Sequence, residues 1–260
     1  LNALNILNHS RVPIEKLKKH IKLLAGIDMG LLRELAVNQK KYFGNISLTE
    51  VSLSTVKGKA ILVSGESIPD LKNVLEAVRD KDINVYTHDE LIIAHSFENF
   101  KNSANLKGHY GSCNENCILD FVTFPGAILL TRNSNINTEY LYRGRLFTTS
   151  NILPKGVIPV KDHDFSALVK SAENAKGFAK GHSKPSEIIG YNPEELTATI
   201  NNLAEKFNKN EIRHIVVLGL GTSKTSQQVY FDKFVESLPQ DVFVISFSYR
   251  TKRDNFLYIN

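Results

Sequence analysis

Short, largely apolar segments alternate with helical patterns through most of this chain, and this alternation constrains the fold more than any other feature. Residues 59–65 form the first such segment, and Ser67 and Pro69 directly after it are residue types that begin helices. Further segments of this kind lie at residues 83–87, 127–131, 145–149, 214–219 and 241–247. Strands with little polar alternation are typical of parallel sheets covered on both faces. We therefore predict an α/β fold with two Rossmann-like parallel-sheet units.

A short helical segment is predicted before the two sheet units. Within residues 1–45, apolar side chains such as Ile14, Ile21 and Leu24 recur at helical spacing, and Gly44 marks the end of the pattern. An apolar stripe of this kind usually packs in a core or against another domain. We expect this segment to be the end of a longer helical domain.

The two sheet units are predicted at residues 46–185 and 186–260, separated by a polar, turn-rich stretch at 179–193. The second unit contains barely two predicted strands, so we expect it to be truncated. A sheet this small leaves an edge strand exposed. We therefore predict that a protein partner, or a second copy of the chain in a homo-oligomer, covers it.

Composition excludes several classes of protein. The chain has 260 residues, of which 42% are hydrophobic and 23% charged, and no apolar run is long enough to cross a membrane. Its 2 cysteines are too few for a disulfide scaffold. The net charge of +5 is spread along the sequence, which argues against a nucleic-acid surface. The first residues do not resemble a signal peptide, so we expect a cytoplasmic protein that binds neither nucleic acid nor membrane.

Ligands of open α/β sheets lie at the carboxyl ends of the strands, so the turns that follow the predicted strands are candidate sites. One such turn places Gly219, Gly221, Thr222 and Ser223 directly after an apolar segment. Backbone amides in this turn could bind a phosphate or a nucleotide cofactor. The turn lacks the third glycine of the dinucleotide motif, and a tight turn that needs glycine for its backbone angles explains it as well.

A second turn, at residues 87–90, combines an imidazole with two carboxylates, which are ligand types that hold iron or zinc, and predicts a metal site at Glu90. Glu66, in the turn after the first strand, is a second candidate carboxylate. A solvated helix cap is the alternative. Cys113 and Cys117 have no second cysteine pair, so we interpret them as structural or free thiols. No Ser/His/Asp or Cys/His catalytic set can be assembled from spacing alone, and we name no catalytic residue.

The chain resembles the hybrid cluster protein family, also called prismane proteins or hydroxylamine reductases, and more distantly the carbon monoxide dehydrogenases. The segments that carry the resemblance follow one another in the family's order, at residues 57–65, 83–90, 124–131, 145–149, 211–219 and 238–241. The resemblance implies a helical domain followed by two Rossmann-like domains. It also implies a mixed iron–sulfur–oxygen cluster between these two domains, at which hydroxylamine or nitric oxide is reduced.

The positions that hold this cluster in the family are largely altered here. Glu90 matches a family glutamate, whereas Glu66 stands where the family has histidine. The family's alignable cysteines correspond to Ser134, Gly221 and Tyr249, and the remaining ligands would lie beyond the last residue. Hydroxyl groups and glycine are poor substitutes for thiolates. The resemblance therefore implies that the cluster does not assemble and that no cofactor is bound.

Three functions follow from these observations. The first is a hydroxylamine-reductase-like scaffold that has lost its cluster cysteines and serves as a non-catalytic binding or structural module. The second is an oxidoreductase of the hydroxylamine or nitric oxide reductase type, or a subunit of one, whose cleft uses Glu66, Glu90, His88 and Arg132. The third is a nucleotide- or phosphate-binding Rossmann domain.

Overall fold

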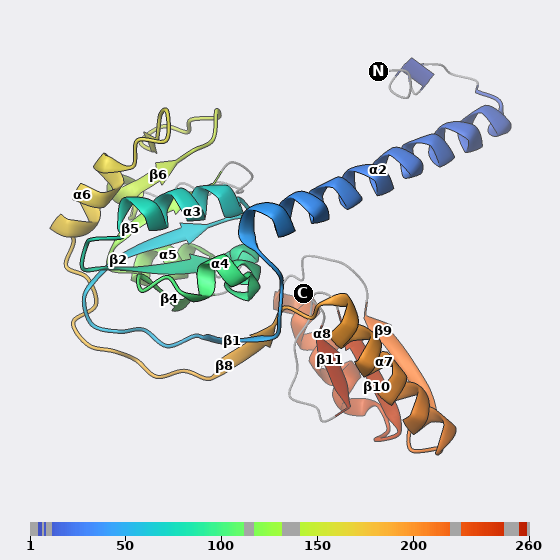
Figure 1. The fold of residues 1–260 in the computed structure, drawn as a ribbon. Coiled ribbons are helices and arrows are strands. Elements are labelled where there is room, and N and C mark those ends of the chain that lie inside the picture. Colours follow the sequence, from blue (N-terminus) through green and yellow to red (C-terminus); the bar gives the residue numbers. More distant parts are fainter. Residues whose placement is uncertain are drawn as a thin grey trace. The chain divides into compact units, whose positions relative to one another are not determined.

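The computed structural model describes residues 5–6, 8, 12–111, 117–131, 141–218, 225–246 and 255–258 (Figure 1). The chain folds into two compact units, Leu1–Asn45 and Ile46–Asn260. The predicted α/β fold is confirmed, with an N-terminal helix and a central six-stranded parallel sheet.

The first unit contains one long helix, α2 (Ile14–Phe43), which begins after Pro13 and ends at Gly44, where φ is 86°. Positive φ is easy for glycine and stops a helix cleanly. The apolar residues of the predicted stripe are exposed, with Ile21 at 65% and Leu24 at 49%. The expectation that this stripe is buried is therefore not met within the unit itself.

The six-stranded sheet has the strand order β4-β3-β2-β5-β6-β7, and all of its neighbouring strands run parallel. Its strands are β2 (Lys59–Ser64), β3 (Ile83–His88), β4 (Leu106–His109), β5 (Ala127–Leu130), β6 (Leu146–Thr148) and β7 (Ile158–Pro159). The chain adds β3 and β4 on one side of β2, then returns to add the later strands on the other. The strand order therefore reverses between β2 and β5, which is where open α/β sheets place their ligands.

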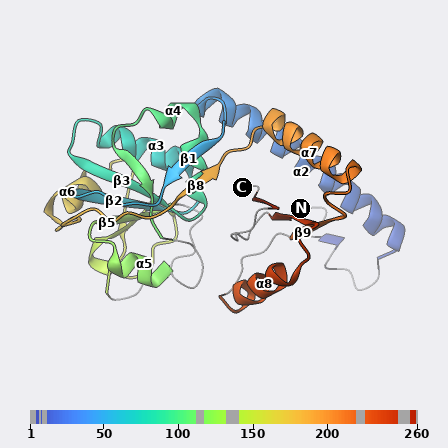
Figure 2. The same ribbon diagram turned by 90° about the horizontal axis from the view of Figure 1, so that it is seen from below.

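Helices lie on both faces of this sheet, as the apolar strands predict (Figure 2). They are α3 (Ile68–Ala77), the 3₁₀ helix η1 (Asp89–Ser96), α4 (Glu98–Lys101), α5 (Cys117–Thr123), the 3₁₀ turn η2 (Arg143–Arg145) and α6 (Ser166–Asn174). The predicted helix start after β2 is confirmed, because Ser67 Oγ accepts from the Asp70 amide at 3.3 Å and Pro69 lies in the first turn of α3.

One core cluster joins the sheet to α5. Alternate strand residues such as Ala60, Leu62 and Tyr86 pack with Phe121 and Phe124. Since successive strand side chains point to opposite faces, Ile61 and Val63 of the same strand are buried on the α3 side. Both faces of the central strands are buried, and this explains why their sequences are largely apolar.

Arg145 fastens α5 to the sheet. Its guanidinium donates to the carbonyl oxygens of Phe121 at 2.6 Å, Val122 at 3.3 Å and Gly126 at 2.7 Å. The first two carbonyls belong to the last turn of α5, where helix carbonyls lack partners within the helix. Burial lowers the pKa of Arg145, and the nearby Tyr110 opposes this shift. A planar cation with several donors is suited to this task.

A second parallel sheet has the order β11-β10-β9, with strands β9 (His214–Leu218), β10 (Val242–Ser246) and β11 (Phe256–Tyr258). Helix α7 (Pro193–Asn208) packs through Leu203 on Phe243 and Leu257, and α8 (Thr225–Ser237) packs through Val235 on the opposite side chains of β9 and β10. The two strands predicted here are present as β9 and β10, and β11 is an additional strand.

A two-stranded antiparallel ribbon joins β1 (Thr49–Ser52) to β8 (Ser186–Ile189), so the segment after α6 returns to the start of the sheet unit. Thr55 and Gly58 continue this pairing by isolated bridges to His182 and Phe178. Among the described residues, no helix combines the length and apolarity that a membrane crossing needs.

Candidate functional site

The carboxyl edge of the six-stranded sheet carries a group of buried polar side chains. Each strand from β2 to β6 ends in, or is followed by, a hydroxyl or an imidazole, and these residues are Ser64, Thr87, His88, His109, Thr131 and Thr148. Polar groups are rarely buried unless they bond one another. The hydrogen bonds between these side chains therefore decide which of them remain available to bind a ligand.

Three side chains at this edge form a hydrogen-bonded chain. Ser64 and His88 are in register on adjacent strands, and Ser64 Oγ lies 2.8 Å from His88 Nδ1. The other ring nitrogen, His88 Nε2, lies 3.3 Å from Asp120 Oδ2 on α5. The His88 ring also packs against Phe121, with the ring centroids 5.1 Å apart. These hydrogen bonds therefore link β2, β3 and α5.

A Ser-His-Asp set usually suggests a nucleophile, but burial excludes that role here. Ser64 is 3% exposed and His88 is 0% exposed. A nucleophilic hydroxyl needs a place beside it for the atom it attacks. Because both side chains are buried, we interpret this set as a polar link between the sheet and α5.

A second network surrounds Thr87. Its hydroxyl lies 2.9 Å from His95 Nε2 and 3.0 Å from His109 Nδ1. His95 also bonds the backbone at Gly108, an interaction that raises its pKa and therefore uses the ring as donor. Since a neutral ring has only one donor nitrogen, Nε2 of His95 accepts from Thr87. Thr87 has one hydroxyl hydrogen, so His109 Nδ1 is the donor in the other contact.

This network predicts acid-sensitive stability. Burial lowers the pKa of His95 to about 4 from its usual 6.5, while the unfolded chain keeps the usual value. Between these values the unfolded state binds more protons than the folded state, so the free energy of unfolding falls as the pH falls from about 6.5 to 4. The His95 contribution to this fall is up to about 3 kcal/mol.

Urea unfolding of the wild-type chain and of His95→Gln at several pH values from 7 to 4 measures this contribution. The two stability curves should converge as the pH is lowered, because the variant lacks the titrating ring. Parallel curves over this range would show that His95 does not titrate as its burial requires.

The amides at the point where the strand order reverses are already satisfied. Thr131 Oγ1 accepts from the backbone N–H groups of Glu66 at 3.1 Å and Ser67 at 3.3 Å. These are the donors that an anion at the start of α3 would use. An internal hydroxyl takes the place of a phosphate oxygen in this turn.

The two predicted metal ligands are both on the surface. Glu66 lies in the turn between β2 and α3, and Glu90 lies in the first turn of η1. Among the described residues, no cluster of three or more His, Cys, Asp or Glu side chains could hold a metal ion. The predicted phosphate turn, with Gly219, Gly221, Thr222 and Ser223, lies outside the described residues, as do Arg132, Ser134 and Tyr249.

Sequence reasoning missed the residues that this edge brings together, among them Ser64, Asp120 and Thr131. A usable signal exists for Ser64 and Thr131, because each is the first polar residue after a run of apolar strand residues. Asp120 carries no such signal. It reaches His88 only because α5 crosses back under the sheet.

The donor set at this edge can be compared with what a sulfide-bridged iron cluster needs. Such clusters are held by cysteine thiolates. The described strand ends supply hydroxyls, imidazoles and carboxylates, and most of these are engaged with one another. The one described cysteine, Cys117, is half-buried at the start of α5. The described strand ends therefore offer oxygen and nitrogen donors and no thiol.

Comparison with known proteins identifies the family. The sequence model of the Prismane/CO dehydrogenase family matches residues 11–256. The hydroxylamine reductase of Acidiphilium cryptum is 30% identical over 94% of this chain and 44% of its own length. Those of Thermodesulfovibrio yellowstonii and Rhodobacter capsulatus are 33% and 34% identical, over 81% and 78% of this chain and 39% and 38% of their own lengths. The chain thus spans less than half the length of these relatives. The resemblance seen in the sequence is confirmed, and the chain belongs to the Prismane/CO dehydrogenase family.

Proposed function

We propose that this chain is a hydroxylamine-reductase-like scaffold without the family's cluster, and that it acts as a non-catalytic binding or structural module. One observation carries the proposal, namely the absence of sulfur donors where the family has them. Ser134, Gly221 and Tyr249 occupy the alignable cysteine positions, and the described strand ends offer no thiol in exchange. Neutral hydroxyls do not replace thiolates as ligands of sulfide-bridged iron.

The packing of the sheet edge supports the same proposal. Hydroxyl and imidazole groups bond one another and are closed off from solvent, as Ser64 and His88 show. In such a scaffold, the strands keep the fold, while the polar side chains at the strand ends bond one another. These side chains are then not available to bind a cluster or a substrate. The predicted oxidoreductase used His88 as a cleft residue, and a wholly buried ring does not serve that role.

Dye-linked reduction of hydroxylamine tests the non-catalytic role. The chain, purified without oxygen and incubated with iron and sulfide, should oxidise reduced methyl viologen no faster in the presence of hydroxylamine than the buffer does. The Acidiphilium cryptum relative, treated in the same way, provides the comparison. Turnover by this chain that is lost in Glu90→Gln would instead establish the oxidoreductase.

The predicted partner for the second sheet stays a prediction, and we propose edge strand β9 as the surface that it contacts. Edge strand β9 pairs with β10 only, among the described residues, and its Ile215 and Val217 side chains are 46% and 58% exposed. Exposed apolar edges favour pairing with another chain. A second copy is the simplest occupant, because two identical edges can pair about a two-fold axis.

Light scattering on the eluting protein measures this association. The wild-type chain should elute with twice its 29.2 kDa mass, and Val217→Lys should return it to that mass. Lys206→Gln on α7 is a control that leaves β9 unchanged. A wild-type monomer at high protein concentration would exclude a homo-oligomer through this edge.

A further inference from the structure

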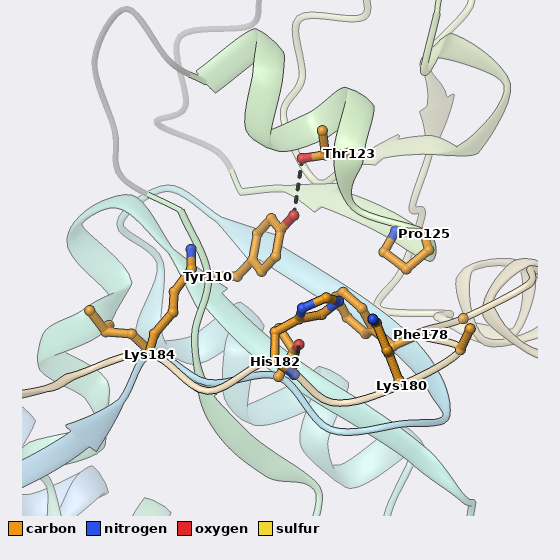
Figure 3. A pocket seen from close by; sticks show the side chains of 11 residues that line it. Tyr110, Thr123, Pro125, Phe178, Lys180, His182 and Lys184 are labelled. Atoms are coloured by element: carbon orange, nitrogen blue, oxygen red, sulfur yellow. Dashed lines mark hydrogen bonds between the residues drawn. The ribbon is translucent and has the colours of Figure 1, made fainter.

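A cavity of 440 Å³ lies beside the end of α5 (Figure 3). Its lining includes Tyr110, Thr123, Phe178, Lys180, His182 and Lys184. These residues come from the segment after β4, from the end of α5 and from the segment between α6 and β8. Cavities of this size hold small organic molecules.

The wall that carries the cationic residues is held in place by backbone pairing. Thr55 and His182 exchange two backbone hydrogen bonds, of 2.9 and 3.0 Å, and Gly58 and Phe178 exchange two more, of 3.0 and 2.8 Å. Gly177 has φ 71°, and a Cβ there would lie 2.3 Å from the Gly58 carbonyl oxygen. The wall is therefore formed before any ligand arrives, which lowers the entropic cost of binding.

Aromatic rings form the floor. The centroids of the Tyr110 and Phe178 rings lie 5.9 Å apart, and Phe124 supports both from behind at 5.1 and 5.5 Å. Rings at such separations present flat apolar surfaces against which a planar ligand can stack.

The hydroxyl of Tyr110 is oriented by Thr123. Thr123 Oγ1 donates to the Leu119 carbonyl at 2.8 Å, so its single hydrogen is in use. The Tyr110 hydroxyl, 3.0 Å from Thr123 Oγ1, is therefore the donor in their contact (Figure 3). Its oxygen keeps lone pairs that can accept a hydrogen bond from a ligand.

The two lysines make the rim cationic, and a histidine lies between them in the sequence. Lys180, His182 and Lys184 are all exposed, and the Lys184 ammonium lies 5.9 Å from the centroid of the Tyr110 ring. No Asp or Glu is among the residues that line the cavity, all of which the structure describes. In the described part of the chain, neither lysine takes part in an ion pair. A cavity with cations at its rim and rings at its floor has a polarity that suits an organic anion.

We propose that this cavity binds a small planar organic anion, and that a hydroxylated aromatic carboxylate matches its chemistry. The ligand's ring would stack on Phe178 beside Tyr110, its carboxylate would meet a lysine at the rim, Lys180 or Lys184, and its hydroxyl would donate to the Tyr110 oxygen. The proposal rests on the residues that line the cavity and not on Ser134, Gly221 or Tyr249, so the two proposals stand or fall separately.

Fluorescence titration with 6-hydroxy-2-naphthoate tests the proposal, and the chain contains no tryptophan to obscure the signal. The wild-type chain should bind this probe at least tenfold more tightly than the neutral 6-hydroxy-2-naphthamide. The double variant Lys180→Gln/Lys184→Gln should lose at least tenfold in affinity for the naphthoate. Lys170→Gln, an exposed lysine on α6 outside the cavity, should bind as the wild type does.

The variant Tyr110→Phe distinguishes specific binding in the cavity from nonspecific binding to a positively charged surface. It should weaken 6-hydroxy-2-naphthoate while leaving 2-naphthoate, which lacks the hydroxyl, unchanged. Equal binding of the amide and the carboxylate, unchanged affinity in the double lysine variant, or full displacement by an equal concentration of inorganic phosphate would each overturn the proposal.

Discussion

Replacement of Gly126 by alanine is expected to destabilise the chain by about 4 kcal/mol or more, which is the range of severe core substitutions. Gly126 precedes β5, and a Cβ there would lie 1.9 Å from the Ala60 carbonyl oxygen and 2.7 Å from its carbon. Both atoms belong to the backbone of β2, which is buried on both faces. The clash can be relieved only by moving two central strands apart.

A glycine-to-alanine substitution at an open position is the control for the steric clash expected at Gly126. Gly144 also has no positive φ, and a Cβ there meets no atom within 4 Å. Urea unfolding should therefore show Gly144→Ala within about 0.5 kcal/mol of the wild type, as for ordinary surface changes. A Gly126→Ala chain as stable as Gly144→Ala would mean that β2 and β5 do not approach each other as described.

The sheet was predictable from the sequence because its central strands are buried on both faces. Strands β2, β3 and β5 each consist almost wholly of buried residues, and a strand without polar alternation is visible as such. Helices α3 and α7 were equally visible, since each begins with a capping side chain and a proline.

Other elements had no local signal. Strand β4 contains lysine and glycine in place of an apolar run, and its pairing with β3 decides its conformation. The ribbon of β1 and β8 joins residues 49–52 to residues 186–189, and each strand is a half-exposed segment that becomes a strand only through the other. Tertiary pairing of this kind lies outside what local propensity reveals.

The site was less predictable than the fold. The predicted carboxylates Glu66 and Glu90 are exposed, whereas the polar groups that the fold brings together are buried. Ser64 and His88 are 24 residues apart and meet through strand register, and Asp120 joins them from 32 residues beyond His88. The anion cavity likewise depends on Tyr110 and Lys184, which no spacing rule connects.

The second large effect that we expect is on the amount of iron and sulfide that the chain binds. Clusters of the family's type need several thiolates, and the chain has serine, glycine and tyrosine where the alignable ones stand. Under the proposed function, these positions supply no thiolate to hold sulfide-bridged iron. We therefore expect an all-or-none difference in bound iron and sulfide between this chain and a cluster-containing relative, rather than a graded loss of affinity.

Iron and acid-labile sulfide, measured on chain purified and reconstituted without oxygen, test whether the family's cluster assembles on this chain. We expect far less than one iron and one sulfide per chain after desalting, while a cluster-containing member of the family handled in parallel retains both. Stoichiometric iron and sulfide on this chain, with the electron paramagnetic resonance of a coupled cluster, would contradict it.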